Sequence, residues 1–306
     1  MAFHGPPEPG LEDVLAEVRR IEVQSRRLVK DVMAGGYVSV FRGAGLEFET
    51  VREYEEGDAP RHIDWNVTAR MGRPFVKTYV DERELSVMFV LDTSESMDGG
   101  YGLWSARQTA ARICGCLAFS AAHNNDKLGL VAGGASVAHH VPPRKGLGQA
   151  LRIVRDCLVL RSHEEQSDLG PLIARATRSQ RRRAIVFVLS DFLARGWEEA
   201  MRQARRRHDV VAVPLQLPEM LPPRAGLVRL RDPESGRGML VDLRQRRLRE
   251  AWADRARAHK AGVAERFRRL GVDVMPVDVP VDAESDPIAG PILRFFRMRE
   301  QRGQKR

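Results

Sequence analysis

The chain has 306 residues, 43% of them hydrophobic and 30% charged, which is enough for one sizeable core and an appended subdomain. It has no run of about 18 apolar residues and no amino-terminal signal pattern, so we expect neither a membrane span nor secretion. Its three cysteines lack a CxxC spacing, which disfavours a disulfide framework or a zinc cluster and favours a cytoplasmic protein. Its net charge of +9 comes from basic residues scattered along the chain, which disfavours a nucleic-acid groove.

The amino-terminal part predicts one helix followed by an irregular segment. Residues 1–10 are rich in proline and glycine and are predicted to be disordered. Apolar residues then recur at helical spacing from Leu11 to Val32, before a pair of glycines. Residues 36–84 are too polar for a helix and too long for an ordinary loop, so we expect a specific structure in which Tyr54 and Trp65 are packing anchors. Residues 11–84 therefore form one amino-terminal unit.

From Leu85 onward, short apolar runs alternate with amphipathic stretches. This alternation predicts a doubly wound α/β domain with a mostly parallel sheet over residues 85–296. A hairpin insertion is expected near residues 228–242, and residues 297–306 are predicted to be a basic tail. The helix after the hairpin is expected to bury Leu248, Trp252, Ala256, Val263, Phe267 and Leu270. The predicted strands cover residues 85–92, 127–133, 135–141, 183–191, 209–217 and 272–279, and the helices cover about 104–123, 146–160, 168–180, 197–207 and 244–270.

Oxygen-bearing side chains follow two of the predicted buried strands. One strand ends at Asp92, which begins a D-x-S-x-S pattern with Ser94 and Ser96, and a second strand ends at Asp191. A third loop adds the hydroxyl of Ser167 just before a helix. Ligands of open α/β sheets bind beyond the carboxyl ends of the strands, where such loops meet. Oxygen donors with few charges suit Mg²⁺, with Mn²⁺ or Ca²⁺ as alternatives, and do not suit zinc or copper.

These five residues resemble the metal-ion-dependent adhesion site of von Willebrand factor A-type domains. The resemblance implies that the hydroxyls of Ser94, Ser96 and Ser167 contact the metal directly. It also implies that Asp92 and Asp191 hold the metal through water. Ser167 stands where that family usually has threonine, so it keeps the hydroxyl and loses the β-methyl group that restricts its rotamer. An open coordination position would then accept an acidic side chain of a partner protein.

A second resemblance lies in the segment before the first predicted strand. The residues that carry it are Arg42 to Phe48, Arg52 to Tyr54, Gly57-Asp58, Arg61 to Trp65, Ala69-Arg70 and Val76-Lys77. They resemble the signature of a bacterial family known as domain-of-unknown-function family 58, and the similarity covers most of residues 36–296. Members of that family are commonly linked with AAA+ ATPases of the MoxR type in assembling or activating other proteins. The resemblance therefore implies a non-enzymatic, Mg²⁺-dependent interaction module with such an ATPase as partner.

Charged residues of both signs are dense in the same segment. We favour a buried or half-buried ion-pair network that locks the segment against the sheet over a catalytic site. The predicted members of this network are Glu47, Arg52, Glu53, Asp58, Arg61, Asp64 and Arg70.

Three other interpretations of the sequence compete with a metal-dependent interaction module. Asp92, Asp191 or Ser167 taken singly could be a helix cap or a turn residue. A metal-dependent hydrolase or phosphotransferase is an alternative, although the second carboxylate that dehalogenase-type phosphatases need is replaced by Ser94. Nucleic-acid binding through residues 244–249 and 297–306 is the third. No GxxxxGK[ST] sequence is present, which disfavours nucleotide hydrolysis.

Overall fold

The centre of the protein is a mixed α/β unit built on a mostly parallel sheet. The computed structural model describes residues 11–34, 47–55, 57–80, 85–99, 103–161, 167–194, 196–217, 226–231, 238–282 and 288–303. The strand order is β10-β7-β6-β3-β4-β5, in which β5 runs antiparallel to β4, and β11 also pairs with β7. The strands are β3 (Ser86–Asp92), β4 (Lys127–Gly133), β5 (Val137–Arg144), β6 (Ile185–Ser190), β7 (Asp209–Gln216), β10 (Asp273–Val274) and β11 (Val277–Asp278).

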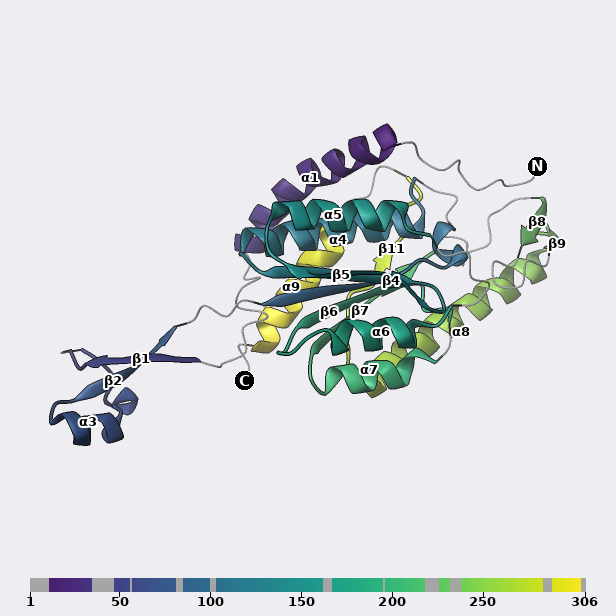
Figure 1. The fold of residues 1–306 in the computed structure, drawn as a ribbon. Coiled ribbons are helices and arrows are strands. Elements are labelled where there is room, and N and C mark those ends of the chain that lie inside the picture. The colour runs from purple at the N-terminus through teal and green to yellow at the C-terminus, as the bar shows by residue number, and fades with distance from the viewer. Residues whose placement is uncertain are drawn as a thin grey trace.

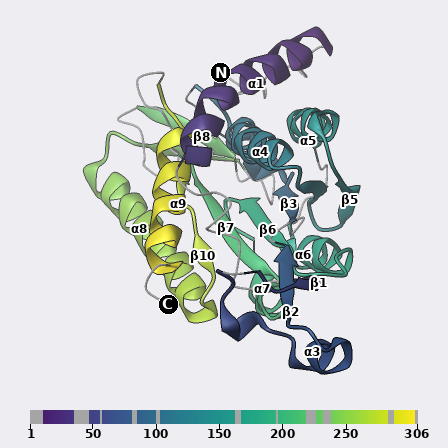
Figure 2. The ribbon, with the colours of Figure 1, turned by 90° about the vertical axis from the view of Figure 1, so that its left-hand side faces the viewer.

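Helices cover both faces of this sheet because the central strands are apolar on both sides. In β3, Phe89 and Leu91 belong to one core cluster, while Met88 and Val90 belong to the other. This division follows from strand geometry, since successive side chains point to opposite faces. One face is covered by α1 (Leu11–Ala34), α4 (Ala106–His123), α5 (Leu147–Val159) and α9 (Ala289–Gly303), and the other by α6 (Leu169–Arg178), α7 (Trp197–Arg205) and α8 (Arg246–Leu270) (Figures 1 and 2).

The strand order determines where loops can form a common site. The chain passes from β3 to β4 on one side of the sheet, and from β6 to β7 on the other, while β3 and β6 are themselves neighbours. At the carboxyl ends of β3 and β6, the two connections therefore leave the sheet toward opposite faces. Such a point is the preferred ligand position in open α/β sheets.

The segment predicted to be irregular contains regular elements. The described part forms a small antiparallel pair, β1 (Glu47–Glu53) and β2 (Phe75–Val80), with a 3₁₀ turn η1 (Pro60–His62) and a short helix α3 (Trp65–Met71) between them. The expectation that this stretch is too polar for a helix was wrong for α3. Its local hydrogen bonds explain why, because Asp64 caps the helix by accepting from two backbone N–H groups and Gly72 ends it in the left-handed conformation.

The carboxyl-terminal part also differs from the sequence prediction. Residues 297–303 are the last turns of α9 and are not a tail, and Arg299 bonds to Asp209 and Asp273 at the start of two strands. The predicted last strand is divided into β10 and β11, with Pro276, which has no N–H to donate, between them. The expected burial of Leu248 was wrong, since its side chain is 41% exposed. None of the described helices is both long and apolar enough to cross a membrane.

Candidate metal centre

Asp92 is the centre of a hydrogen-bonded cluster at the carboxyl end of β3. Its side chain is fully buried. The Oδ1 atom accepts the backbone N–H of Ser94 at 2.9 Å, and the Oδ2 atom accepts the hydroxyl of Ser190 at 2.7 Å. The hydroxyl of Ser167 lies 3.4 Å from both carboxylate oxygens. One carboxylate thus gathers groups from three separate loops.

The two serines of the D-x-S-x-S pattern lie next to each other. Their Oγ atoms are 3.1 Å apart, so both hydroxyls are on the same side of the loop, as the alternating spacing predicted. The following 3₁₀ turn, η2 (Glu95–Asp98), fixes this arrangement at its other end. Met97 is buried in the core, and Asp98 accepts a 2.6 Å hydrogen bond from the buried guanidinium of Arg107 on α4. The serine loop is therefore held by packing on one side and by an ion pair on the other.

The third loop reaches the cluster through the start of α6. Asp168, and not Ser167, is the residue that caps this helix, since its Oδ1 atom accepts the N–H of Gly170 at 2.8 Å. The backbone N–H of Asp168 also donates to the carbonyl oxygen of Gly134, in the turn between β4 and β5, at 3.2 Å. These two bonds leave the hydroxyl of Ser167 directed at Asp92. Capping alone therefore does not explain the position of Ser167.

The loop after β6 carries Asp191 and a residue that the sequence analysis missed. Asp191 is buried, with 5% of its surface exposed, and its Oδ1 atom accepts the N–H of Leu193 at 3.0 Å. Ser190 joins this loop to the cluster, because its hydroxyl donates to Asp92 and accepts the N–H of Phe192 at 2.9 Å. The signal for Ser190 is the strand pairing, which sets Leu91 beside Leu189 and hence Asp92 beside Ser190. That pairing is not visible in the sequence.

A strained backbone conformation follows Asp191. Phe192 has φ of +55°, which is uncommon for a bulky residue that is not glycine. Its ring is fully buried and packs edge-on against Trp197 and Phe267, with ring centroids 5.2 Å and 4.9 Å away. This aromatic cluster fixes the turn, so the position of Asp191 is determined by the core beneath it.

Burial determines the electrostatics of the centre. Removal from water raises the pKa of Asp92 above its ordinary 3.8, against the lowering effects of hydrogen bonds from Ser94, Ser190 and Ser167. Because burial makes the ionised form of this carboxyl group costly, a nearby cation would stabilise that form by compensating its charge. Among the described residues no group of three or more His, Cys, Asp and Glu side chains is placed to hold a metal ion. The donors gathered at this centre are mainly hydroxyls instead.

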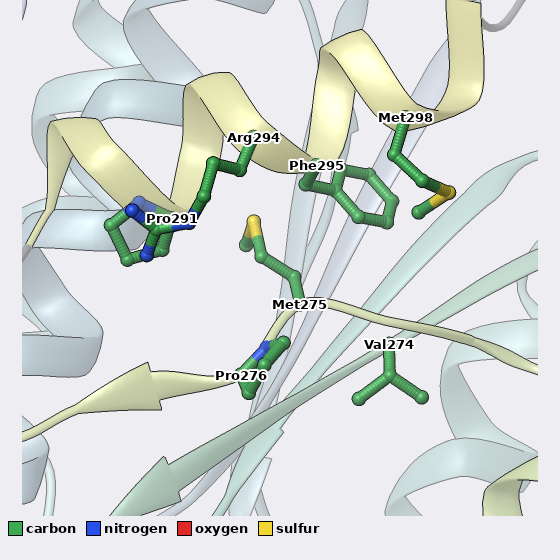
Figure 3. Close-up of a pocket in the computed structure, with 7 residues that line it drawn as sticks. All are labelled: Val274, Met275, Pro276, Pro291, Arg294, Phe295 and Met298. Atoms are coloured by element: carbon green, nitrogen blue, oxygen red, sulfur yellow. The ribbon is translucent and has the colours of Figure 1, made fainter. Parts of the chain in front are cut away.

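A hollow among the described residues lies away from this centre. It measures about 160 Å³ and lies between α9 and the β10–β11 region, lined by apolar side chains and by Arg294 (Figure 3). None of the five predicted metal ligands lines it, so this hollow is not part of the candidate centre. The lining residues are Val274, Met275, Pro276, Pro291, Arg294, Phe295 and Met298.

The predicted ion-pair network of the amino-terminal segment is local and exposed. Arg52 pairs with Asp58 at 2.7 Å and lies 3.7 Å from Glu55, and Glu53 pairs with Arg73 at 3.4 Å. Within the described residues, none of these pairs reaches the sheet, and β1, β2 and α3 stand apart from it (Figure 1). The expectation of a network locked against the sheet was wrong for these residues.

The other predicted members of that network have different roles. Asp64 caps α3 and Arg70 is exposed, while the side chains of Glu47 and Arg61 lie outside the described part. Trp65, expected to be a packing anchor, is 69% exposed. The reason is that the described part of this small unit consists of two strands, a 3₁₀ turn and one short helix, which form no second layer that could bury charges or rings.

Comparison with known proteins places the chain in a bacterial context. The family model described as "Protein of unknown function DUF58" matches residues 50–262. Uncharacterized proteins of Mycobacterium tuberculosis and Mycobacterium bovis are each 30% identical over 293 residues, covering 94% of this chain and 90% of theirs. Among solved structures, the conserved hypothetical protein BatB from Bacteroides thetaiotaomicron is 18% identical with a TM-score of 0.45, covering 71% of this chain and 99% of its own.

Proposed function

This chain belongs to the family described as protein of unknown function DUF58, and we propose that it is a non-enzymatic, Mg²⁺-dependent protein-interaction module of the von Willebrand factor A type. The observation that carries the proposal is the convergence of three loops on Asp92. The hydroxyls of Ser94 and Ser96 lie 3.1 Å apart beside Asp92, and the hydroxyl of Ser167 lies 3.4 Å from its carboxylate. Ser190 joins the loop of Asp191 to the same carboxylate.

The donor set fits a hard cation. Mg²⁺ binds six oxygen ligands at 2.0–2.1 Å in octahedral geometry, which places neighbouring ligands about 2.9 Å apart. The 3.1 Å between the Oγ atoms of Ser94 and Ser96 is close to this spacing. Ser94, Ser96 and Ser167 would hold the ion directly. Asp92, whose oxygens already accept hydrogen bonds, would act through water, as would Asp191.

Such a centre is suited to binding an acidic partner. A bound Mg²⁺ would supply an open coordination position that takes an aspartate or glutamate side chain of another protein. The residues of this chain hold that position in place, because Arg107 fixes the serine loop and the aromatic rings fix the loop of Asp191. The partner we propose is an AAA+ ATPase of the MoxR type, which acts with this chain in assembling or activating other proteins.

Calorimetry with Mg²⁺ tests the metal centre without needing the partner. We expect heat of binding for the unmodified protein, and a rise in melting temperature with Mg²⁺ concentration, because a ligand of the folded state stabilises it. The double variant Ser94→Ala/Ser96→Ala should lose both effects and keep its fold by circular dichroism. A protein that gives no heat with Mg²⁺, Mn²⁺ or Ca²⁺ would contradict the proposal.

A binding assay with the purified MoxR-type ATPase of the same organism tests the partner. Binding is expected with Mg²⁺ and should be lost with EDTA and in the double serine variant. The matched control is Ser179→Ala, which removes a hydroxyl that bonds the carbonyl oxygen of Ala176 at the end of α6, away from the centre. Equal binding in all these conditions would rule out a metal-dependent contact.

A further inference from the structure

A second surface protrudes from the carboxyl edge of the sheet. It consists of β8 (Leu227–Arg231), β9 (Gly238–Asp242) and residues 246–260 of α8, which we call the hairpin arm. The buried residues of α8 are Val263, Phe267 and Leu270, so no side chain in the first four turns of the helix is buried. Figure 1 shows β8 and β9 at the far end of α8, beyond the ends of the sheet strands.

Two of the five paired positions of the hairpin are apolar on both strands, and they alternate with pairs that contain charged residues. The register pairs Val228 with Val241 and Leu230 with Met239, and paired positions share one face of a two-stranded sheet. Met239 is 64% exposed, so this face is not covered there. A two-stranded hairpin is at best marginally stable alone, and it gains stability when another element packs on its apolar face. The hairpin arm thus exposes apolar surface that a segment of another protein can cover.

Apolar exposure continues around the arm. Leu227 and Leu240 are 59% and 61% exposed, and Leu248 on the adjoining helix is 41% exposed. Arg249 ties the two parts together by donating to the carbonyl oxygens of Leu243 and Arg244. Because successive residues of a strand point to opposite faces, Leu227 and Leu240 lie on the face opposite Met239. Both faces of the hairpin therefore expose apolar side chains, and the start of α8 adds Leu248.

The arm also concentrates positive charge. Residues 226–231 and 238–260 contain nine arginines and lysines against three aspartates and glutamates, a surplus of six, while the whole chain has +9. Arg244, Arg246 and Arg257 are paired with nearby acids. Arg247 and Arg255 are exposed, and no ion pair is seen for either among the described residues. Excess charge of this kind favours an acidic partner and opposes the approach of a second copy of the chain.

We propose that the hairpin arm is a docking surface for an acidic amphipathic protein segment, whose apolar side covers Met239 and its neighbours and whose carboxylates face the arm's arginines. Nucleic acid fits less well, because the uncovered face of the hairpin is apolar and carries no aromatic ring to stack on bases. This surface goes beyond the proposed metal centre and does not need it. It lies on the same side of the sheet, however, so one acidic partner could contact both.

Fluorescence anisotropy with defined probes tests the arm on the full chain. The probe is a labelled peptide of about 18 residues with leucines at helical spacing and glutamates elsewhere. We expect it to bind, and to bind about tenfold more weakly to Met239→Ser/Leu240→Ser and to Arg247→Glu/Arg255→Glu. The matched control Leu15→Ser/Val23→Ser removes two exposed apolar residues of α1 and should bind as the unmodified chain does.

Further measurements distinguish the hairpin arm from the metal centre, from a nucleic-acid site and from a self-association surface. Binding should persist with EDTA and in Ser94→Ala/Ser96→Ala, whereas loss under either condition would assign the peptide to the metal centre and overturn the docking surface. No binding of the glutamate peptide, or equal binding of a lysine version, would also overturn it. Tighter binding of a duplex of about 20 base pairs would assign the arm to nucleic acid. Self-association that disappears in Met239→Ser/Leu240→Ser would assign it to a second copy.

Discussion

The loops around Asp92 and the unit formed by β1, β2 and α3 are both rich in charged and hydroxyl side chains, yet they organise them in opposite ways. Around Asp92, residues far apart in the sequence meet in a buried cluster, as Ser190 does with Asp92 across 98 positions. In the amino-terminal unit, most hydrogen bonds and ion pairs join residues close in the chain, such as Arg52 with Asp58. The difference teaches that polar residues converge where strands of a large sheet end together.

The two regions also treat the same residue type differently. Burial raises the pKa of Asp92, whereas the hydrogen bond from Arg52 lowers the pKa of Asp58. Two tryptophans differ likewise, since Trp197 is fully buried and Trp65 is 69% exposed. Substitutions in the two regions should therefore have very different effects, and the following pairs measure the contrast.

The largest contrast is expected between Trp197→Ala and Trp65→Ala. Removing Trp197 opens a cavity against Phe192 and Phe267, and should cost about 3–5 kcal/mol of unfolding free energy. Removing Trp65 creates no cavity, so the urea midpoint should not change. Urea denaturation followed by circular dichroism measures both. Similar losses for the two variants would mean that the amino-terminal unit is packed against another part of the chain.

The next contrast concerns two hydroxyls that each accept a backbone N–H. Ser190→Ala leaves the buried N–H of Phe192 and one oxygen of Asp92 without this partner, and should cost about 1–3 kcal/mol. Thr68→Val removes the acceptor for the N–H of Phe75, which is only half-buried and can bond water instead. Its loss should be smaller. Chemical denaturation compares the two, and a larger loss for Thr68→Val would reverse the assignment of buried and exposed clusters.

A pH series in EDTA distinguishes the two carboxylates. Because the folded-state pKa of Asp92 is raised above 3.8, the folded protein binds more protons than the unfolded one just above that pH. The stability contributed by protonated Asp92 is thus present at low pH and lost as the pH rises through the raised pKa. Asp92→Asn should remove this loss, so its stability relative to the unmodified protein should increase with pH. A difference independent of pH would contradict the raised pKa.

The smallest effect is expected for Arg52→Gln. The pair with Asp58 lies at the surface, where solvent screens the charges and the side chains must be ordered to meet. The lowered pKa of Asp58 has the opposite sign to that of Asp92, so any contribution should appear above pH 3.8 and be lost as the pH falls. We expect no measurable change in melting temperature at neutral pH. A marked decrease would indicate that the predicted network is completed by residues beyond those described.

Much of the candidate site could be predicted because Asp92 and Asp191 directly follow sequence runs that indicate buried strands. Asp92 and Asp191 follow runs such as Val87–Leu91 and Ile185–Leu189, whose continuous apolar character predicts buried strands. The alternation of Ser94 and Ser96 predicted that their hydroxyls share one side, and they are 3.1 Å apart. Ser190 was not predicted as a site residue, because nothing in the sequence distinguishes it from other serines. Only the pairing of β3 with β6 places it beside Asp92.

The sequence by itself determined the apolar runs, and with them the mostly parallel sheet, the helices on both faces and the strand ends at which polar residues collect. Tertiary structure alone decided which strands are neighbours and that β10 and β11 both pair with β7. It also decided that, among the described residues, the first half of α8 and the unit around Trp65 stay largely exposed. The physical reason is the distance along the chain over which each kind of information acts. Periodicity reports which side of an element avoids water, whereas the identity of its neighbour depends on contacts between residues far apart in the chain.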